Sequence, residues 1–142
     1  MAKLRSTCSR RQVGAVLIKD RRIIATGYNG SPIGFDNCCE IGKCIRDERH
    51  IQSGTQVSIT MAVHAEINCI CSAAYMGIST KGSTLYITNF PCSDCLKACI
   101  QSGIEKIFYE EEYNDAFSHE LAEKSSIKII KLNGEENGQE TL

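Results

Sequence analysis

Two short segments of the sequence bring together side chains that bind metal ions and transfer protons. One is HAE, with His64 and Glu66, and the other is PCSDC, with Cys92 and Cys95. Two thiolates and one imidazole make three zinc ligands and leave the fourth tetrahedral position open, as in catalytic rather than structural zinc sites. A carboxylate beside such a position can accept a proton from water and pass it on. The two segments therefore predict a catalytic zinc site with Glu66 as its proton-transfer group.

The spacing of the two cysteines supports a shared ion. Residues three apart lie on one face of a helix, so Cys92 and Cys95 can reach the same metal. Pro91 before them is typical of the first turn of a helix, where free N–H groups and the helix dipole favour thiolates. Taken alone, C-x-x-C could be a redox pair or half of a structural zinc site, and H-x-E could be a helix cap. Both motifs together, each opening a helix after a strand, favour the catalytic site.

The elements that would carry these segments alternate between strands and helices. Strands are predicted at residues 12–19, 23–30, 83–88, 104–110 and 127–132, and helices at 64–76, 91–103 and 114–125, the last with Asn114 or Asp115 as its N-cap. Strands that alternate with helices form a mostly parallel sheet with helices on its faces, here preceded by an antiparallel hairpin. We therefore predict a single α/β domain over residues 1–132, followed by a polar tail at 133–142 that frays.

Residues 31–60 separate the hairpin from the first long helix and show no strong periodicity. A structureless segment of this length is uncommon in a compact domain and is usually functional or contains a short helix, for which 43–51 is the candidate. In the helix that follows, apolar and small side chains recur at helical spacing and are predicted to face the core: Ile67, Ile70, Cys71, Ala74 and Tyr75.

The charge balance argues against some classes of partner. The 142 residues carry a formal net charge of −1, whereas proteins that coat nucleic acids are usually basic; one basic cluster, RSTCSRR, lies near the N-terminus. No apolar stretch approaches the roughly 18–20 residues of a membrane span, and the first residues lack the apolar core of a signal peptide. We therefore expect no nucleic-acid or membrane partner and a cytoplasmic location, which for a viral protein would be the host cytoplasm.

The sequence contains nine cysteines. An odd number argues against a complete disulfide framework, and a reducing compartment favours metal ligands and buried thiols. Cys69, Cys71 and Cys99 lie within helical patterns and are predicted to be small core residues.

The order H-x-E…P-C-x-x-C resembles the signature of the zinc-dependent deaminases. The likeness extends to further blocks of the chain: RSTCSRRQVGAVL, ATGYNGSPIG, HAEINCI, GSTLYIT, PCSDCLKACIQSGI and FYEEEY. Together they resemble the deoxycytidylate (dCMP) deaminase family over residues 4–113. The resemblance implies a three-layer α/β/α sandwich of the cytidine-deaminase type with a five-stranded mixed sheet.

The resemblance also implies the reaction. Members of this family hydrolyse dCMP to dUMP and ammonia with a catalytic zinc ion, and so supply dUMP for thymidylate synthesis. Relatives usually have a longer helix before RSTC, and this difference leaves deamination of dCTP to dUTP, alone or in addition, as an alternative. Deamination of a base within RNA or DNA fits less well with the charge and with the GYNG block. A zinc-stabilised binding module without turnover would have no use for Glu66.

Several residues take roles from the resemblance. His64, Cys92 and Cys95 correspond to the zinc ligands, and Glu66 corresponds to the proton shuttle. Further positions correspond to substrate contacts: Asn29 for the sugar 3′-hydroxyl, the backbone near Ala65 and Phe90 for the pyrimidine, Ser6, Arg10 and Arg11 for the phosphate, and Tyr113 over the sugar or phosphate. The basic cluster could instead be a solvated end of the chain, and Tyr113 could be a packing residue.

Regulation and assembly are implied in the same way. Family members are commonly hexamers that are activated by dCTP and inhibited by dTTP at an interface site, which includes the GYNG block with Tyr28, Asn29 and Gly30. A triphosphate effector would bring Mg²⁺ with it. We therefore expect a homo-oligomer with such a site, although Tyr28 could equally be a packing residue.

The chain departs from the family at a second, structural zinc site that many relatives hold. Those relatives use a cysteine at the position of Cys8, and a histidine and a cysteine where this chain has Val57 and Thr60. Without these ligands, one zinc per chain is expected, and residues 31–60 must be ordered by packing or by bound nucleotide. A replacement site could be formed by Cys38, Cys39, Cys44 and His50.

Overall fold

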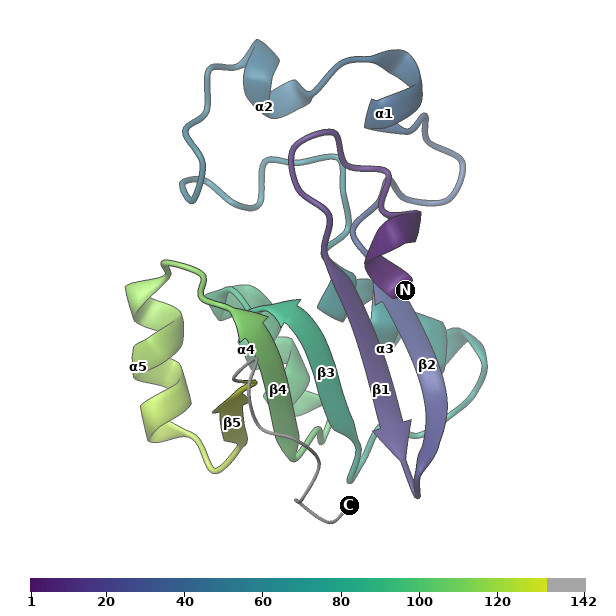
Figure 1. Ribbon diagram of the computed structural model, residues 1–142, viewed down its shortest axis with the longest axis vertical. Coiled ribbons are helices and arrows are strands. Elements are labelled where there is room, and N and C mark those ends of the chain that lie inside the picture. Colours follow the sequence, from purple (N-terminus) through teal and green to yellow (C-terminus); the bar gives the residue numbers. More distant parts are fainter. Residues whose placement is uncertain (133–142) are drawn as a thin grey trace.

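The computed structural model describes residues 1–132 of the chain, and the predicted tail at 133–142 lies outside the described residues (Figure 1). The strands are β1 (Gly14–Lys19), β2 (Arg22–Tyr28), β3 (Thr84–Asn89), β4 (Lys106–Glu111) and β5 (Lys128–Lys131). The longer helices are α3 (Ala65–Tyr75), α4 (Ser93–Gln101) and α5 (Ala116–Lys124). Three short helices complete the elements: η1 (Ala2–Arg5), α1 (Cys38–Ile41) and α2 (Ile45–Glu48). All the predicted strands and long helices are therefore confirmed.

The five strands form one mixed sheet in the order β2-β1-β3-β4-β5. β1 is antiparallel to both β2 and β3, whereas β3, β4 and β5 are parallel to one another. The turn between β1 and β2 contains Asp20 and Arg21, both with positive φ, as a tight hairpin turn requires. The predicted antiparallel hairpin ahead of a parallel sheet is thus confirmed.

The long helices pack on the same face of this sheet. α3 contacts β1 and β2, α4 contacts α3, and α5 contacts α4; α3 and α4 lie behind the sheet in Figure 1. Right-handed crossovers between parallel strands that progress in one direction place their helices on one face. The opposite face meets η1 at Gly14, where a Cβ atom would lie 2.4 Å from the backbone nitrogen of Lys3. Within residues 1–132, the three long helices therefore form the layer on one face of the sheet, and η1 covers part of the other face.

The hydrophobic core lies between the sheet and the long helices. Alternate residues of the strands point into it, including Leu17, Leu85 and Ile107, which have no exposed surface. β2 and α3 approach so closely that a Cβ atom on Gly27 would lie 2.2 Å from the carbonyl oxygen of Ala65. Only glycine allows the two backbones to come this close, so Gly27 lets the start of α3 pack directly against β2.

The predicted inner face of α3 is wrong for three of its five residues. Cys71, Ala74 and Tyr75 are exposed, Tyr75 by 88%, and Ile67 and Ile70 are half-buried. The buried residues are instead Ala65, Glu66, Cys69 and Ala73. Where α3 approaches β2 most closely, the buried side chains Cys69 and Ala73 are small, while Ile70 packs half-buried against the core and Tyr75 turns outward. The prediction of Cys69 and Cys99 as core residues is confirmed, and that of Cys71 is wrong.

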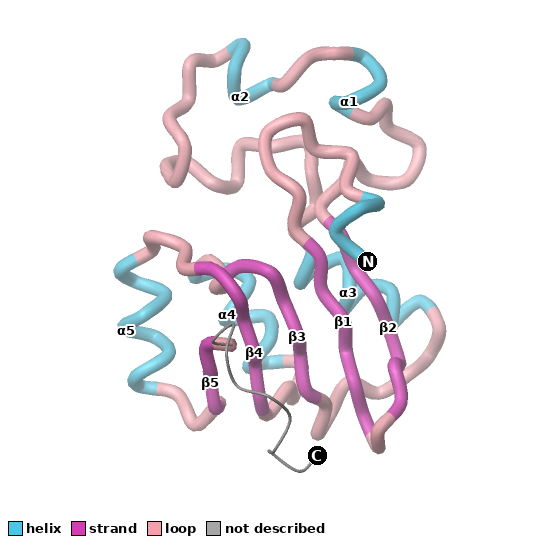
Figure 2. Tube along the Cα trace, viewed as in Figure 1, coloured by secondary structure: helices cyan, strands magenta, loops and turns pink. Residues whose placement is uncertain are grey.

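Residues 31–60 lie beyond one end of the sheet and consist mainly of loop (Figure 2). α2 occupies the middle of the segment predicted to be helical, 43–51, and α1 was not predicted. Among the described residues, no helix has both the length and the apolar character needed to cross a membrane.

Candidate active site

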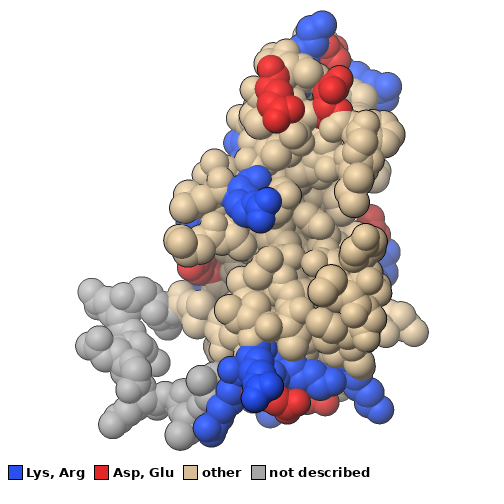
Figure 3. Space-filling model, turned by 90° about the vertical axis from the view of Figure 1, so that its right-hand side faces the viewer, with Lys and Arg blue, Asp and Glu red and all other residues tan. Residues whose placement is uncertain are grey.

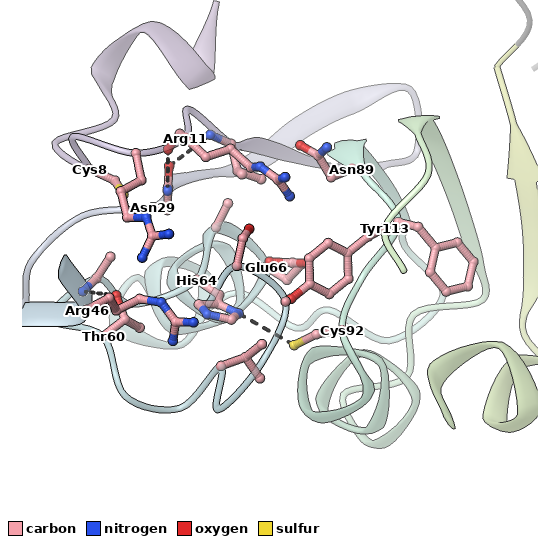
Figure 4. Close-up of a pocket in the computed structure, with 18 residues that line it drawn as sticks. Cys8, Arg11, Asn29, Arg46, Thr60, His64, Glu66, Asn89, Cys92 and Tyr113 are labelled. Atoms are coloured by element: carbon pink, nitrogen blue, oxygen red, sulfur yellow. Dashed lines mark hydrogen bonds between the residues drawn. The ribbon is translucent and has the colours of Figure 1, made fainter. Parts of the chain in front are cut away.

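A cavity lies where the loop segments meet the end of the sheet and the first turns of α3 and α4 (Figure 4). Its walls come from the N-terminal segment, the end of β2, α2 and the loop after it, the end of β3 and the residues after β4. His64, Glu66 and Cys92 all line this cavity. Glu66 and Cys92 are 26 positions apart in the sequence, and the two motifs therefore meet at one site only in the folded chain.

The three predicted zinc ligands form a compact set. His64 Nδ1 lies 3.5 Å from Cys92 Sγ and 3.4 Å from Cys95 Sγ, and all three ligand atoms lie within 4.8 Å of one another. Zinc bonds of about 2.3 Å to sulfur and 2.0–2.1 Å to nitrogen, at tetrahedral angles, imply a nitrogen–sulfur separation of about 3.5 Å. The donor atoms therefore fit zinc. No other group of three such residues in 1–132 is arranged to hold a metal ion.

Local structure explains why these three side chains converge. His64 is the N-cap residue of α3, Cys92 is the N-cap residue of α4, and Cys95 lies in the first turn of α4. Both helices thus direct their positive ends towards the ligands, which favours thiolate. A hydrogen bond from the Cys95 thiol lowers the pKa of Cys92 well below its usual value, so one of the two thiols ionises readily.

Glu66 lies in the first turn of α3 and is only 5% exposed. Burial raises the pKa of its carboxyl to about 7. Its carboxylate lines the cavity and does not belong to the ligand set. His64 and Glu66, two apart, can both face the cavity because His64 precedes the helix rather than lying inside it. One residue can therefore bind metal while the other remains available for proton transfer.

The start of α5 holds the backbone on both sides of Cys92. The Asp115 carboxylate accepts hydrogen bonds from the backbone N–H of Ser93, at 2.9 Å, and of Ser118, at 3.0 Å. The buried Ser118 hydroxyl donates to the carbonyl oxygen of Pro91 at 2.7 Å. Burial alone would raise the pKa of Asp115, but these N–H groups outweigh it and the pKa is lowered. Asp115 was predicted as an N-cap, which is confirmed; Ser118 was missed.

Asn29 is almost buried and makes three hydrogen bonds through its side chain. Its Oδ1 accepts from the Ser6 hydroxyl at 2.6 Å and from the Val13 N–H at 2.8 Å, and its Nδ2 donates to the carbonyl of Arg11 at 2.8 Å. The amide lines the cavity, with one N–H left to offer to a ligand. Ser6, predicted as a phosphate contact, does not line the cavity and supports Asn29 from behind.

The remaining predicted substrate residues all line the cavity: Ala65, Phe90, Arg10, Arg11 and Tyr113. The Arg11 guanidinium lies 5.7 Å from the centre of the Tyr113 ring. Phe90 is held by stacking on His119, with ring centres 4.0 Å apart. Arg46 and Asn89 also line the cavity and were missed, since neither belongs to a recognisable motif.

The charges around the cavity favour an anionic ligand. Arg10, Arg11 and Arg46 contribute three positive charges to its lining, and Glu66 is the sole carboxylate among the described lining residues. A concave site lined by one sign of charge concentrates ligands of the opposite sign. The cavity therefore suits a ligand that carries phosphate.

Two of the three residues predicted for regulation, Tyr28 and Gly30, lie outside this cavity. Tyr28 packs under the Arg5 guanidinium, 5.4 Å from the ring centre, and its carbonyl accepts from Asn68. Gly30 forms an isolated β-bridge with Val63, directly before His64. Of the predicted regulatory residues, Asn29 alone lines the cavity.

The second metal site proposed as a replacement is not assembled in residues 1–132. Cys39 and His50 are exposed, whereas Cys38 and Cys44 are buried, and these four do not form a metal-binding group. Cys8 lines the cavity together with Val57 and Thr60, which offer it neither imidazole nor thiol. Within residues 1–132, the group arranged to hold a metal ion is His64, Cys92 and Cys95.

Comparison with known proteins identifies the family of this chain. Residues 1–111 match the family model of the cytidine and deoxycytidylate deaminase zinc-binding region. ComE operon protein 2 of Bacillus subtilis is 36% identical over 130 residues, which are 91% of this chain and 64% of that protein. Deoxycytidylate deaminase of Enterobacteria phage T4 is 37% identical over 138 residues, with 77% of this chain and 72% of that protein covered.

A solved structure agrees with these relatives. The dCMP deaminase of cyanophage S-TIM5, determined in complex with dCMP and dUMP, superposes with a TM-score of 0.73 at 32% identity. The match covers 92% of this chain and 88% of the cyanophage chain, and the expected cytidine-deaminase fold is thereby confirmed. The residues matched by the family model, 1–111, include His64, Cys92, Cys95, Glu66 and the strands β1 to β4. The chain therefore belongs to the cytidine and deoxycytidylate deaminase family of zinc-binding proteins.

Proposed function

We propose that the protein catalyses the hydrolytic deamination of dCMP to dUMP with release of ammonia. The observation that carries this proposal is the pairing, in one cavity, of the His64–Cys92–Cys95 ligand set with the buried carboxylate of Glu66. The choice of dCMP is supported by the phage T4 relative named deoxycytidylate deaminase and by the cyanophage dCMP deaminase in complex with dCMP and dUMP. The product would be available for thymidylate synthesis.

The residues of the cavity suit this reaction. Zinc held by the three ligands would supply a Lewis acid that lets water attack at neutral pH. Glu66 takes a proton from the attacking water and delivers protons to the pyrimidine ring and to the amino group at C4. The C4–N bond breaks after the C4–O bond has formed, and the amino group leaves as ammonia. A carboxyl with a pKa of about 7 can both accept and donate a proton near neutral pH.

Recognition of the nucleotide is assigned to the polar walls of the cavity. The free N–H of the Asn29 amide faces the sugar, and backbone groups near Ala65 and Phe90 read the pyrimidine edge. Arg10 and Arg11 bind the phosphate, and Tyr113 closes over the sugar or phosphate. Deamination of dCTP remains the second candidate, because the positive charge of the lining would attract one phosphate or three.

Ammonia release measured with dCMP, dCTP, deoxycytidine and CMP tests this assignment. We expect kcat/KM to be at least about 100-fold higher for dCMP than for deoxycytidine, since two charge-assisted hydrogen bonds to the phosphate contribute about 3–6 kcal/mol. A higher value for dCTP than for dCMP would favour the second candidate. Equal values for dCMP and deoxycytidine would contradict the role given to the arginines.

We expect the protein to act in the cytoplasm. All nine cysteines are free thiols, which suits a reducing compartment. Free deoxynucleotides, the proposed substrates, are also intracellular metabolites.

A homo-oligomer, with the hexamer as the expected assembly, is part of the proposal. Figure 3 views the side of the molecule that carries β2 and η1, and the middle of this side is largely uncharged, with charged side chains gathered towards its two ends. Apolar side chains of these elements and the adjoining loop are exposed: Leu4, Ile23, Ile33 and Phe35. Such a surface supports association, because isolated soluble domains rarely expose large apolar patches.

Regulation by dCTP and dTTP is expected at the GYNG block, with Mg²⁺ accompanying the triphosphate. If Tyr28, Asn29 and Gly30 form an effector site between subunits, rate against dCMP concentration should be sigmoidal and should become hyperbolic on addition of dCTP. Light scattering on the same samples should give the mass of six chains. A hyperbolic curve that dCTP does not change, or a monomeric mass, would contradict this part of the proposal.

A further inference from the structure

Arg46, in α2, is a buried arginine that contacts backbone rather than acidic side chains. It is 9% exposed, and no ion pair within residues 1–132 involves it. Its guanidinium instead donates four hydrogen bonds to carbonyl oxygens: Nη1 to Gln56 at 2.7 Å and Ile59 at 3.1 Å, and Nη2 to Thr55 at 2.6 Å and Gln52 at 2.9 Å. Each N–H of the two terminal nitrogens can therefore have its own acceptor.

The four carbonyls belong to one short segment, residues 52–59, which turns around the guanidinium. The described structure of this segment contains neither helix nor strand. Three hydrogen bonds support it internally: two backbone turn bonds, from the N–H of Thr55 to Gln52 and from the N–H of Ile59 to Gln56, and one from the Thr55 hydroxyl to the carbonyl of Gln52. Gln56 and Gly54 have positive φ, an unfavourable conformation for glutamine. Arg46 thus supplies most of the polar contacts that fix the shape of the segment.

This segment, continued to Thr60, forms one wall of the cavity. Ser53, Gly54, Val57 and Thr60 line it, and Figure 4 shows Arg46 beside Thr60. Beyond Thr60, the chain pairs with Gly30 through Val63 and then reaches the ligand His64. The wall is therefore held at one end by Arg46 and at the other by the bridge to Gly30.

α2 and the residues after it also contact Arg10, which lines the cavity and is proposed to bind the phosphate. Arg10 Nη1 lies 3.5 Å from the Asp47 carboxylate and donates to the carbonyl oxygen of Ile51 at 3.4 Å. The Ile51 N–H in turn donates to the carbonyl of Arg46 at 2.8 Å. A displacement of Arg46 would therefore reach both the wall and Arg10.

A buried guanidinium that donates to four carbonyl oxygens of one segment can hold that segment in a single shape. We propose that Arg46 is a positioning residue that fixes the 52–60 wall, and that it thereby sets the affinity for nucleotide. The effect on affinity rests on the proposed function, whereas the effect on the wall does not.

Hydrogen exchange and kinetics of Arg46→Gln and Arg46→Lys test the proposal. For Arg46→Gln, we expect exchange in the peptide covering 52–60 to accelerate at least about tenfold, with β3 and β4 unchanged, because the two turn hydrogen bonds lose their support. KM for dCMP should rise about tenfold while kcat changes less than about threefold, the pattern of lost ground-state positioning. Arg46→Lys keeps the charge but not the planar fork, and should give an intermediate result.

Arg49→Gln serves as the matched control. Arg49 is the exposed C-cap residue of the same helix, and its side chain makes no hydrogen bond or ion pair within the described chain. This variant should show wild-type exchange and KM. Unchanged exchange at 52–60 in Arg46→Gln would overturn the proposal, as would acceleration throughout β3 and β4, which would indicate a general core role.

Kinetics separate the remaining outcomes. Faster exchange at 52–60 with an unchanged KM would overturn the link to affinity. If the wild-type protein does not deaminate dCMP, the proposed function fails, while the exchange data still decide the role of Arg46 in the wall.

Discussion

Replacement of Glu66 by glutamine is expected to abolish deamination while zinc and fold are retained. Glutamine keeps the shape of the side chain but cannot take a proton from water, and loss of a general base lowers the rate by about 10²–10⁴-fold. The ligand set His64, Cys92 and Cys95 does not include Glu66, so zinc content should stay at one per chain. Single-turnover ammonia release and metal analysis of the same preparation give both quantities.

The stability of this variant provides an independent check. Burial raises the pKa of Glu66 to about 7, so the folded protein favours the protonated carboxyl, and ionisation above that pH costs folding free energy. Neutral glutamine has no such cost. The free energy of unfolding at pH 8 should therefore be equal to that of the wild type or higher.

Glu123→Gln is the matched control for the Glu66 variant. Glu123 is an exposed residue of α5, and the same substitution there should leave the rate and the zinc content unchanged. Turnover of Glu66→Gln near the wild-type rate would contradict the mechanism. Loss of zinc from Glu66→Gln would instead assign Glu66 to the metal site.

The zinc site and the sheet could be predicted because their signals are local. His64 and Glu66 lie within three residues, and Cys92 and Cys95 lie within four, so each motif can be recognised without knowledge of the fold. The strands are short runs rich in apolar and β-branched residues between turn residues, and their alternation with helices specifies a mostly parallel sheet. Local patterns thus identify both the chemistry and the elements that carry it.

The inner face of α3 could not be predicted by the same means. Hydrophobicity favoured the face with Ile70 and Tyr75, whereas the structure buries Cys69 and Ala73. The deciding contact is with Gly27, whose missing side chain lets β2 approach the helix backbone. This contact joins residues about 40 positions apart in the sequence, so the periodicity of α3 alone cannot predict it.

Arg46 and Ser118 were missed for a related reason. Both donate hydrogen bonds to backbone carbonyls, Arg46 to the 52–59 segment and Ser118 to Pro91. Every residue has a backbone carbonyl, so the type of the partner residue does not indicate the contact. Such a pair therefore has no sequence signature. Such contacts become visible only when the fold has brought the two segments together.

Replacement of Cys95 by serine is expected to remove zinc, activity and part of the stability together. Cys95 is buried in the first turn of α4, and serine keeps its size but replaces the thiolate with a poor zinc ligand. If free zinc is present at a thousand times its dissociation constant, its loss lowers the free energy of unfolding by about 4 kcal/mol. Metal analysis, thermal unfolding and ammonia release measure the three effects.

Cys71→Ser tests whether these effects depend on the site rather than on loss of a thiol. Cys71 is an exposed residue of α3, and this variant should retain one zinc per chain with wild-type activity and stability. Wild-type zinc content in Cys95→Ser would contradict its assignment as a ligand. Because Glu66→Gln and Cys95→Ser should both lack activity but differ in zinc content and in stability, the two variants together separate proton transfer from metal binding at a single site.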